Sequence, residues 1–192
     1  FGMMVIMQNE WVKAAADIQN YRDIAMSVGH ALRPPVILTN VSCAETREEA
    51  EERAMTYLGA KWDSIDNHYK FSDGHLGSVK GYESYGKMAK TYSKLQDPVA
   101  REKMTKFYVG IQIVGTPDDC IQQMGELQRL TGSDHMVCDF SYGGMPHEQG
   151  ELNMRLFADR CLPTLQRDAA FSGLALVPDA SADVHEGVFA PA

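Results

Sequence analysis

Three short apolar runs alternate with segments of helical periodicity, and this alternation constrains the fold more than any other feature of the sequence. The runs cover Gly2–Met7, Val36–Val41 and His135–Phe140. Continuous apolar runs of this length are typical of strands that are buried on both faces of a parallel sheet. Strands that alternate with helices form right-handed βαβ units. The sequence therefore predicts an α/β fold with a parallel sheet.

Helical periodicity fills the segments after the first two runs. Apolar residues recur at helical spacing over Trp11–Val28, with Asn9 as the expected N-cap and Gly29 as the expected stop. A second helix is expected over about Arg47–Tyr69, because the acidic residues of its first turn complement the helix dipole.

One helix start is especially well marked. Thr116 is a good N-cap, Pro117 suits the first helical position, and two acidic residues follow. Helical spacing then continues to Thr131-Gly132. After a tight loop at Ser141–Pro146, a last helix is expected over about His147–Leu162.

The chain between the second and third runs holds a long insertion. Residues 70–107 carry four glycines and three tyrosines, and we expect a loop, a helix near Tyr82–Leu95 and another after Asp97-Pro98. Residues 107–114 are expected to be extended. Long insertions in α/β domains often serve as lids or partner surfaces. We assign residues 1–166 to one folded unit with this insertion, and residues 167–192, rich in Ala, Pro, Gly and Asp, to a flexible tail.

Charge and cysteine usage exclude several classes of partner. The 192 residues include 18 basic and 26 acidic residues, a net charge of −8, whereas nucleic-acid binding needs a basic face and anionic membranes repel an acidic chain. No apolar run reaches the roughly 18 residues of a membrane span, and no signal peptide is visible. Buried free thiols in the cytoplasm are expected, because Cys43, Cys120, Cys138 and Cys161 lie in apolar patterns without a C-x-x-C pair. The chain opens in mid-strand at Phe1, so we expect it to be part of a longer protein.

Several spaced motifs resemble the C-terminal part of the bacterial luciferase-like flavin-dependent monooxygenases. The opening Gly2–Ile6 is similar to the sixth strand of that family. Gly81-Tyr82 and Tyr85-Gly86 are similar to an insertion found in a subset of its members. The motifs nearer the C-terminus are Val114–Ile121, Thr131–His135, Phe140, Gly143–Glu148, Leu156–Ala158 and Leu162-Pro163.

The resemblance covers residues 1–166 and implies a (β/α)₈ barrel of the TIM type. By this resemblance the chain supplies parallel strands six to eight, with a helical insertion before the last strand. A complete barrel needs roughly 250 residues. The acid–base histidine of the family and most of its flavin contacts lie on the first five strands. No residue of this chain is therefore assigned as the catalytic group.

The resemblance also implies the chemistry. Members oxidise a small organic substrate with dioxygen and reduced FMN, which a separate flavin reductase supplies. We expect a homo-oligomer. One alternative is a deazaflavin-dependent oxidoreductase of the same barrel family. The other is a non-catalytic barrel fragment that self-associates or binds a partner through its open sheet edges and uncovered face.

Barrel active sites lie at the carboxyl ends of the strands, and this places the candidate cofactor-binding or substrate-lining residues. Met7 suits an apolar pocket or a core, and Gln8 could donate to a flavin carbonyl or be a solvated amide. Gly143-Gly144 could bring backbone close to a ligand at a helix N-terminus or form a plain turn. No metal site is expected, because the spacing of His68 and His75 matches no ligand template. The other candidates are Asn40, Phe140, Tyr142, Met145 and His147.

Overall fold

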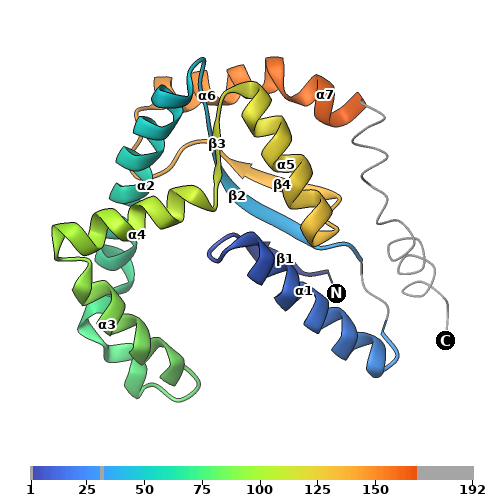
Figure 1. Ribbon diagram of the computed structural model, residues 1–192. Coiled ribbons are helices and arrows are strands. Elements are labelled where there is room, and N and C mark those ends of the chain that lie inside the picture. Colours follow the sequence, from blue (N-terminus) through green and yellow to red (C-terminus); the bar gives the residue numbers. More distant parts are fainter. Residues whose placement is uncertain (1, 31–32, 168–192) are drawn as a thin grey trace.

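The computed structural model describes residues 2–30 and 33–167, in which strands alternate with helices (Figure 1). The strands are β1 (Met4–Ile6), β2 (Val36–Cys43), β3 (Ile113–Gly115) and β4 (His135–Asp139). The α-helices are α1 (Trp11–Ser27), α2 (Arg47–Tyr69), α3 (Gly86–Lys94), α4 (Pro98–Gly110), α5 (Pro117–Thr131), α6 (His147–Arg160) and α7 (Leu162–Arg167). Short 3₁₀ helices cover Phe71–Asp73, His75–Ser78 and Glu83–Tyr85. The tail assigned from the sequence lies outside the described residues, apart from Arg167.

β2 is the centre of a parallel sheet. β1 pairs with residues 36–38 of β2, and β4 pairs with residues 36–40. β3 pairs with the last three residues, 41–43. All of these pairings are parallel, so the predicted α/β fold with a parallel sheet is confirmed.

Two expectations for the strands are wrong. β1 is shorter than the apolar run that predicted it, and it is not buried on both faces, because Met4 is 57% exposed and Ile6 is 51% exposed. The segment 107–114 is not extended throughout, because α4 continues to Gly110 before β3 begins at Ile113. The expectation holds for Ile113 and Val114, which begin β3, a fourth strand beside the three that the apolar runs predict.

Several helix ends also differ from expectation. Glu10 rather than Asn9 occupies the N-cap of α1, and it makes no capping hydrogen bond with its side chain. In the insertion, α3 begins at Gly86, because a 3₁₀ turn precedes it. The last predicted helix is divided at Cys161 into α6 and α7. Gly29 follows α1 with a φ of +81°, in keeping with its expected role as a stop.

The two faces of the sheet have different surroundings. Side chains of successive strand residues point to opposite faces. One face carries Ile37 and Val41 of β2, which pack in a core with α1, α5 and α6. That core contains Met7, Ala14, Ile18, Ile37, Val41, Cys43, Ile113, Cys120, Met124, Leu127, Phe157 and Cys161.

The opposite face of the sheet is exposed over its first half. The strand register places five apolar residues there in adjacent rows, and Val137 is exposed like the two residues of β1. We call these residues the open face. They are Met4, Ile6, Val36, Leu38 and Val137. Within residues 2–30 and 33–167, no strand pairs with the outer edge of β1 or β4.

The side chain of Gln112 joins three strands. It is buried just before β3, and its Oε1 accepts hydrogen bonds from the backbone N–H of Asn40 at 2.9 Å and from the hydroxyl of Thr39 at 3.2 Å. Its Nε2 donates to the backbone carbonyl of Met7 at 3.0 Å. The carboxamide therefore takes the place of a peptide group where β1 has ended, and it fixes β3 to β1 and β2.

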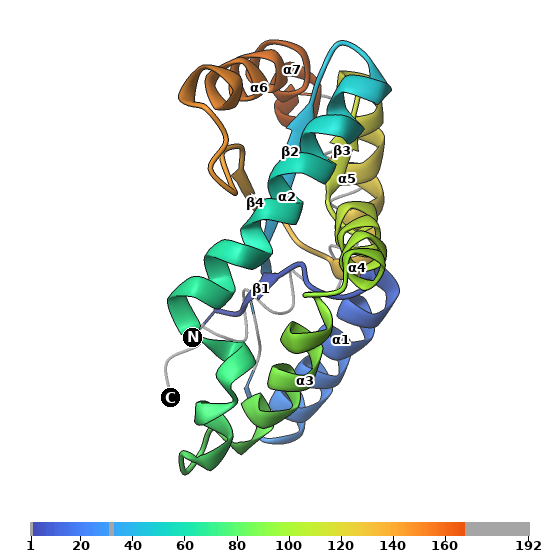
Figure 2. The same cartoon turned by 90° about the vertical axis from the view of Figure 1, so that its left-hand side faces the viewer.

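Figure 1 shows α2, α3 and α4 to the left of the strands and α1 and α5 to the right, and Figure 2 shows α6 and α7 together at one end of the molecule.

α2 and α4 form a second core at the carboxyl end of β2. Arg101 of α4 donates to both carboxylate oxygens of Asp63 of α2 at 2.6 Å, and to the carbonyl of Gly59 at 3.0 Å. The buried members of this core are Ala44, Ala50, Ala54, Leu58, Tyr108, Ile111, Val114, Tyr142 and Met145.

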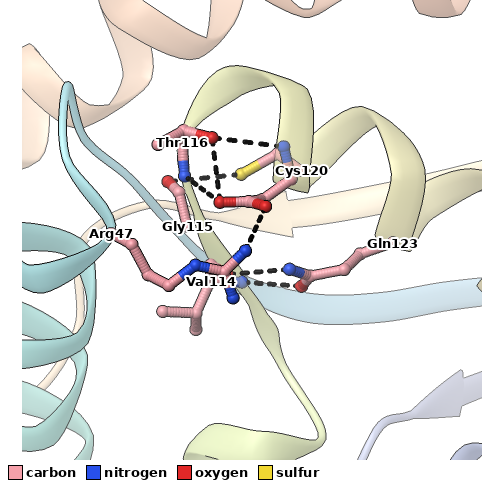
Figure 3. A network of polar contacts seen from close by, with 7 residues as sticks. Arg47, Val114, Gly115, Thr116, Cys120 and Gln123 are labelled. Atoms are coloured by element: carbon pink, nitrogen blue, oxygen red, sulfur yellow. Dashed lines mark hydrogen bonds and ion pairs between the residues drawn. The ribbon is translucent and has the colours of Figure 1, made fainter.

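The start of α5 is the capping arrangement that the sequence predicts (Figure 3). The hydroxyl of Thr116 accepts from the backbone N–H of Asp119 at 3.3 Å, and the Asp119 carboxylate accepts from the backbone N–H of Thr116 at 3.0 Å. Arg47 pairs with the same carboxylate. Gln123 bonds both backbone groups of Val114, at 3.0 and 2.8 Å. The strand–helix junction is therefore held by side chains from two helices.

A Thr116→Ala variant is expected to lose about 1 kcal/mol of unfolding free energy, because the N–H groups of the first turn lose their side-chain acceptor. Urea denaturation followed by circular dichroism measures this loss. A Thr116→Ser variant keeps the hydroxyl and is expected to retain most of the stability. Equal stability of the alanine variant and the wild type would show that the cap contributes nothing.

Stability is expected to fall in acid. The hydrogen bonds from Arg101 lower the pKa of Asp63, and the backbone N–H of Thr116 is the main cause that lowers the pKa of Asp119. A carboxylate with a depressed folded pKa stabilises the fold above its unfolded pKa of about 4, and this contribution is lost as the pH falls through the folded pKa. The urea midpoint should therefore stay level down to about pH 5 and drop below about pH 4. Asp119→Asn should flatten that drop, and a midpoint unchanged at low pH in the wild type would contradict this origin.

Candidate functional site

A polar network lies at the carboxyl ends of β1 and β4, on the same side of the sheet as the open face. Asn40 is buried at its centre and pairs in register with Asp139. The Asn40 Nδ2 donates to the Asp139 carboxylate at 2.9 Å. The Asn40 Oδ1 accepts from the Lys61 Nζ at 3.2 Å and from the Tyr108 hydroxyl at 3.3 Å. We call Asn40, Lys61, Tyr108 and Asp139 the polar network.

Burial governs the ionisation of the network. Burial lowers the pKa of Lys61, and the negative charge of Asp139 opposes that shift. Burial, followed by the same negative charge, raises the pKa of Tyr108 to about 12. Tyr108 is therefore a neutral hydroxyl donor at neutral pH. The Tyr108 hydroxyl uses its one hydrogen on Asn40, whereas the Lys61 ammonium group has three N–H donors and can also bind a carbonyl or hydroxyl oxygen of an otherwise apolar ligand.

The structure brings three of the candidate residues to the carboxyl-terminal side of β2. Asn40 is the centre of the polar network, and Tyr142 and Met145 are buried in the core that α2 and α4 form. The Tyr142 hydroxyl donates to the backbone carbonyl of Val41 at 3.3 Å. Burial raises the pKa of Tyr142 to about 12. Tyr142 and Met145 therefore pack in the same core as Tyr108 of the polar network.

Met7 and Gln8, the two candidates that follow β1, have side chains in different surroundings. Met7 is buried in the core beneath α1 and α5, and its neighbour in that core is Ile37 on the face opposite the open face. Met7 therefore contributes to the core on the face opposite the open face. Gln8 is exposed at the strand end, where its amide is available to solvent or to a ligand.

Gly143 and Gly144 form a left-handed turn between β4 and α6, with φ values of +61° and +78°. A Cβ atom on Gly143 would lie 1.8 Å from the backbone carbonyl oxygen of Tyr57 in α2. A Cβ atom on Gly144 would meet nothing within 4 Å. Gly143 therefore allows the turn to pack on α2, while Gly144 faces open space.

Phe140 and His147 meet at a different place, a cavity of about 440 Å³ between the end of β4 and α6. Phe140 packs against Phe157 with ring centroids 5.2 Å apart. The His147 side chain is 92% exposed and lies 3.9 Å from Glu151. Asp139 contributes to both this cavity and the polar network. Asp139 is therefore shared by the cavity and the polar network.

Similarity to known proteins identifies the family of the chain. The model of the Luciferase-like monooxygenase family matches residues 1–134 of the sequence. The chain belongs to this family. Luciferase-like monooxygenases typically use reduced flavin. Among solved structures, monooxygenase RslO1 from Streptomyces bottropensis is similar, with 21% sequence identity, a TM-score of 0.48 and coverage of 84% of this chain.

The luciferase-like chain spans 41% of the length of RslO1. No curated protein matches the sequence. Among residues 2–30 and 33–167, no group of three or more His, Cys, Asp or Glu residues is arranged to hold a metal ion. In the same part of the chain, no helix is long and apolar enough to cross a membrane. The four cysteines are free thiols, of which Cys138 is half-buried and the other three are buried.

Three residues of the polar network in this luciferase-like chain, Lys61, Tyr108 and Asp139, are not among the candidates that the sequence indicates. Tyr108 falls in the segment that was expected to be extended, whereas α4 carries it into the core. Lys61 lies within α2, three residues after the buried Leu58 and four before the half-buried Ile65. A charged residue on the apolar stripe of a helix is a signal for such a position. Asp139 directly precedes Phe140, the first of the candidate residues at the end of the last strand.

Proposed function

We propose that this chain forms strands six to eight of a luciferase-like barrel, as β1, β2 and β4, and that the complete protein is a flavin-dependent monooxygenase. The observation that carries the proposal is the position of the polar network. It lies at the carboxyl ends of parallel strands, where barrel enzymes bind their ligands, and it borders the open face. The open face would then be part of the inner wall of the barrel.

The residues on this side of the sheet suit a flavin. An isoalloxazine ring needs an apolar wall and a few donors for its carbonyl oxygens. The open face supplies the wall through residues such as Ile6 and Leu38, and Lys61 and Gln8 supply donors. Reduced FMN would supply the electrons with which dioxygen oxidises a small organic substrate. The fit supports a flavin in general and selects no substrate.

This chain's own residues would orient and shield the ligand. Asn40 is held by hydrogen bonds at both ends of its amide, so it fixes the direction of the Lys61 ammonium group and the Tyr108 hydroxyl. We expect the insertion and α4 to cover the carboxyl-terminal side and to limit the access of water. We also propose that the protein is a cytoplasmic homo-oligomer and that a flavin reductase supplies it with reduced FMN.

A non-catalytic role is the second candidate, and the open face favours it. Met4, Ile6 and Val137 are exposed apolar residues in adjacent rows, and such patches bind other protein surfaces. The sheet also has unpaired outer edges in the described part of the chain. In this reading the network is structural and the chain associates with itself or with a partner.

Oxygen consumption by the complete protein distinguishes these readings. The protein is supplied with FMN, NAD(P)H and a flavin reductase, and consumption above that of the reductase alone is expected. A parallel assay with a reduced deazaflavin tests the related oxidoreductase. If the protein increases the oxidation of neither reduced FMN nor the reduced deazaflavin, and if it associates stably with itself, the non-catalytic role is favoured.

A further inference from the structure

A continuous series of aromatic rings leads from the polar network into the insertion. The ring of Tyr108, whose hydroxyl bonds Asn40, has its centroid 5.0 Å from that of Trp62. Trp62 lies 6.3 Å from Tyr92, and Tyr92 lies 5.2 Å from Phe71. Each ring in this series is therefore in contact with the next.

The series ends at tyrosines that reach solvent. Phe71 stacks against Tyr69 at 5.3 Å with an interplanar angle of 19°, and against Tyr85 at 5.7 Å with an angle of 18°. Tyr69 and Tyr85 are both exposed, while Phe71 and Tyr92 are buried. The rings thus connect the candidate site to exposed tyrosines at the end of α2 and in the insertion.

The surroundings of Trp62 favour electron transfer between the rings of this series. Indole and phenol rings are among the side chains most easily oxidised by one electron, and electrons pass readily between rings in contact. Within the described part of the chain, the Trp62 Nε1–H is buried and has no hydrogen-bond partner. An oxidised Trp62 has no adjacent acceptor for this proton, so it keeps the proton and remains a strong oxidant. It would therefore take an electron from a neighbouring ring.

We propose that these rings form an electron relay that carries oxidising equivalents from the polar network to the protein surface. One electron leaves an exposed tyrosine, tunnels across Phe71 without oxidising it, passes through Tyr92 and Trp62, and reduces a one-electron oxidant at the network, of the class that light-excited flavin represents. The exposed tyrosine releases its phenolic proton to water and becomes a neutral radical, and the oxidant gains one electron. A thiol or ascorbate in solution can then restore the tyrosine.

The biological use of the relay rests on the proposed function, because a site that handles flavin and dioxygen needs protection from stray oxidation. The relay itself rests on the ring geometry alone. A packing role for the same rings is the competing explanation, since Phe71 and Tyr92 also form the small core of the insertion. A photochemical experiment that needs no flavin binding separates these explanations and keeps the relay testable if the proposed function fails.

The experiment places an oxidant beside the network. A Ser141→Cys variant is labelled with a ruthenium photosensitiser, because the backbone N–H of Ser141 bonds Asp139 at 3.2 Å and the residue is exposed. Three of the native cysteines are buried, and burial raises the pKa of Cys138 to about 11. The introduced thiol is therefore the preferred site of labelling at neutral pH.

After a laser flash and oxidative quenching, the labelled protein is expected to show the absorption of a tyrosyl radical. Tyr108 and Tyr142 lie near the label and can give a tyrosyl signal of their own, so the relay is reported by the part of the signal that a Tyr69→Phe/Tyr85→Phe double variant removes. Trp62→Phe replaces an oxidisable ring with one that only lengthens the tunnelling distance, and it is expected to remove most of that same part. Trp11→Phe removes the other tryptophan of the chain, which is outside the series, and is expected to leave the signal unchanged. If Trp62→Phe impairs folding, as judged by circular dichroism, Tyr92→Phe provides the same interruption. An exposed-tyrosine part of the signal that survives both Trp62→Phe and Tyr92→Phe, or that is missing in the labelled parent, would overturn the relay.

Discussion

A Gly143→Ala variant is expected to lose at least about 4 kcal/mol of unfolding free energy, which is an exceptional loss for one methyl group. The added Cβ would lie 1.8 Å from the carbonyl oxygen of Tyr57, and the φ of +61° is unfavourable for alanine. The clash involves two backbone segments, so no side-chain rotation relieves it. The turn would have to leave α2, and Tyr142 would lose its contact with β2. Thermal and urea denaturation measure the loss.

Gly144→Ala is the matched control for this prediction. It has a similar φ of +78°, but its Cβ would meet nothing within 4 Å. Only the cost of a left-handed alanine remains, about 1–2 kcal/mol. Equal losses for the two variants would show that the turn does not depend on its contact with α2.

Asn153→Leu is expected to cost about 4 kcal/mol, because it leaves buried backbone groups without partners. Asn153 of α6 is 0% exposed. Its Oδ1 accepts from the backbone N–H of Cys43 at 2.7 Å, and its Nδ2 donates to the carbonyls of Val41 at 2.7 Å and Phe140 at 3.0 Å. Leucine fills the space but satisfies none of these groups. Only Val41 keeps another donor, the hydroxyl of Tyr142.

Leu152→Ala is the control for this second prediction, since Leu152 is the preceding residue of α6 and its side chain is exposed. A change within about 0.5 kcal/mol is expected there. Urea denaturation of both variants compares them directly. If Asn153→Leu were as stable as the wild type, the side-chain amide would not be what joins α6 to the end of β2.

The parts of the fold that local patterns specify were predictable from the sequence. Thr116 and Pro117 predict the start of α5, and the structure has the full capping box there. The acidic first turn predicts α2 with the observed bounds Arg47–Tyr69. In both cases the determining interactions lie within one helix turn, where sequence spacing and spatial contact coincide.

The parts that depend on distant contacts were not predictable. β3 has only three residues, and Gln112, a polar residue just before it, fixes it to β1 and β2 over about 70 to 105 positions of sequence. The polar network is similar, because Lys61 of α2 and Tyr108 of α4 reach Asn40 from the helix before the insertion and from the helix at its end. Only the position of Asn40 near the strand end pointed to this place. A hydrogen bond between distant segments leaves no periodic signal in the sequence.

The central claim is that the polar network and the open face belong to a flavin site. Its most direct test is a titration of the complete protein with FMN, in which binding is monitored by flavin fluorescence. We expect saturable binding that Lys61→Met weakens about tenfold, a free-energy change of about 1.4 kcal/mol, because the network loses its charged donor. Lys13→Met, at an exposed lysine of α1, should leave the affinity unchanged. Absence of saturable FMN binding, or equal affinities for the Lys61 variant and the wild type, would contradict the assignment of the polar network and the open face to a flavin site.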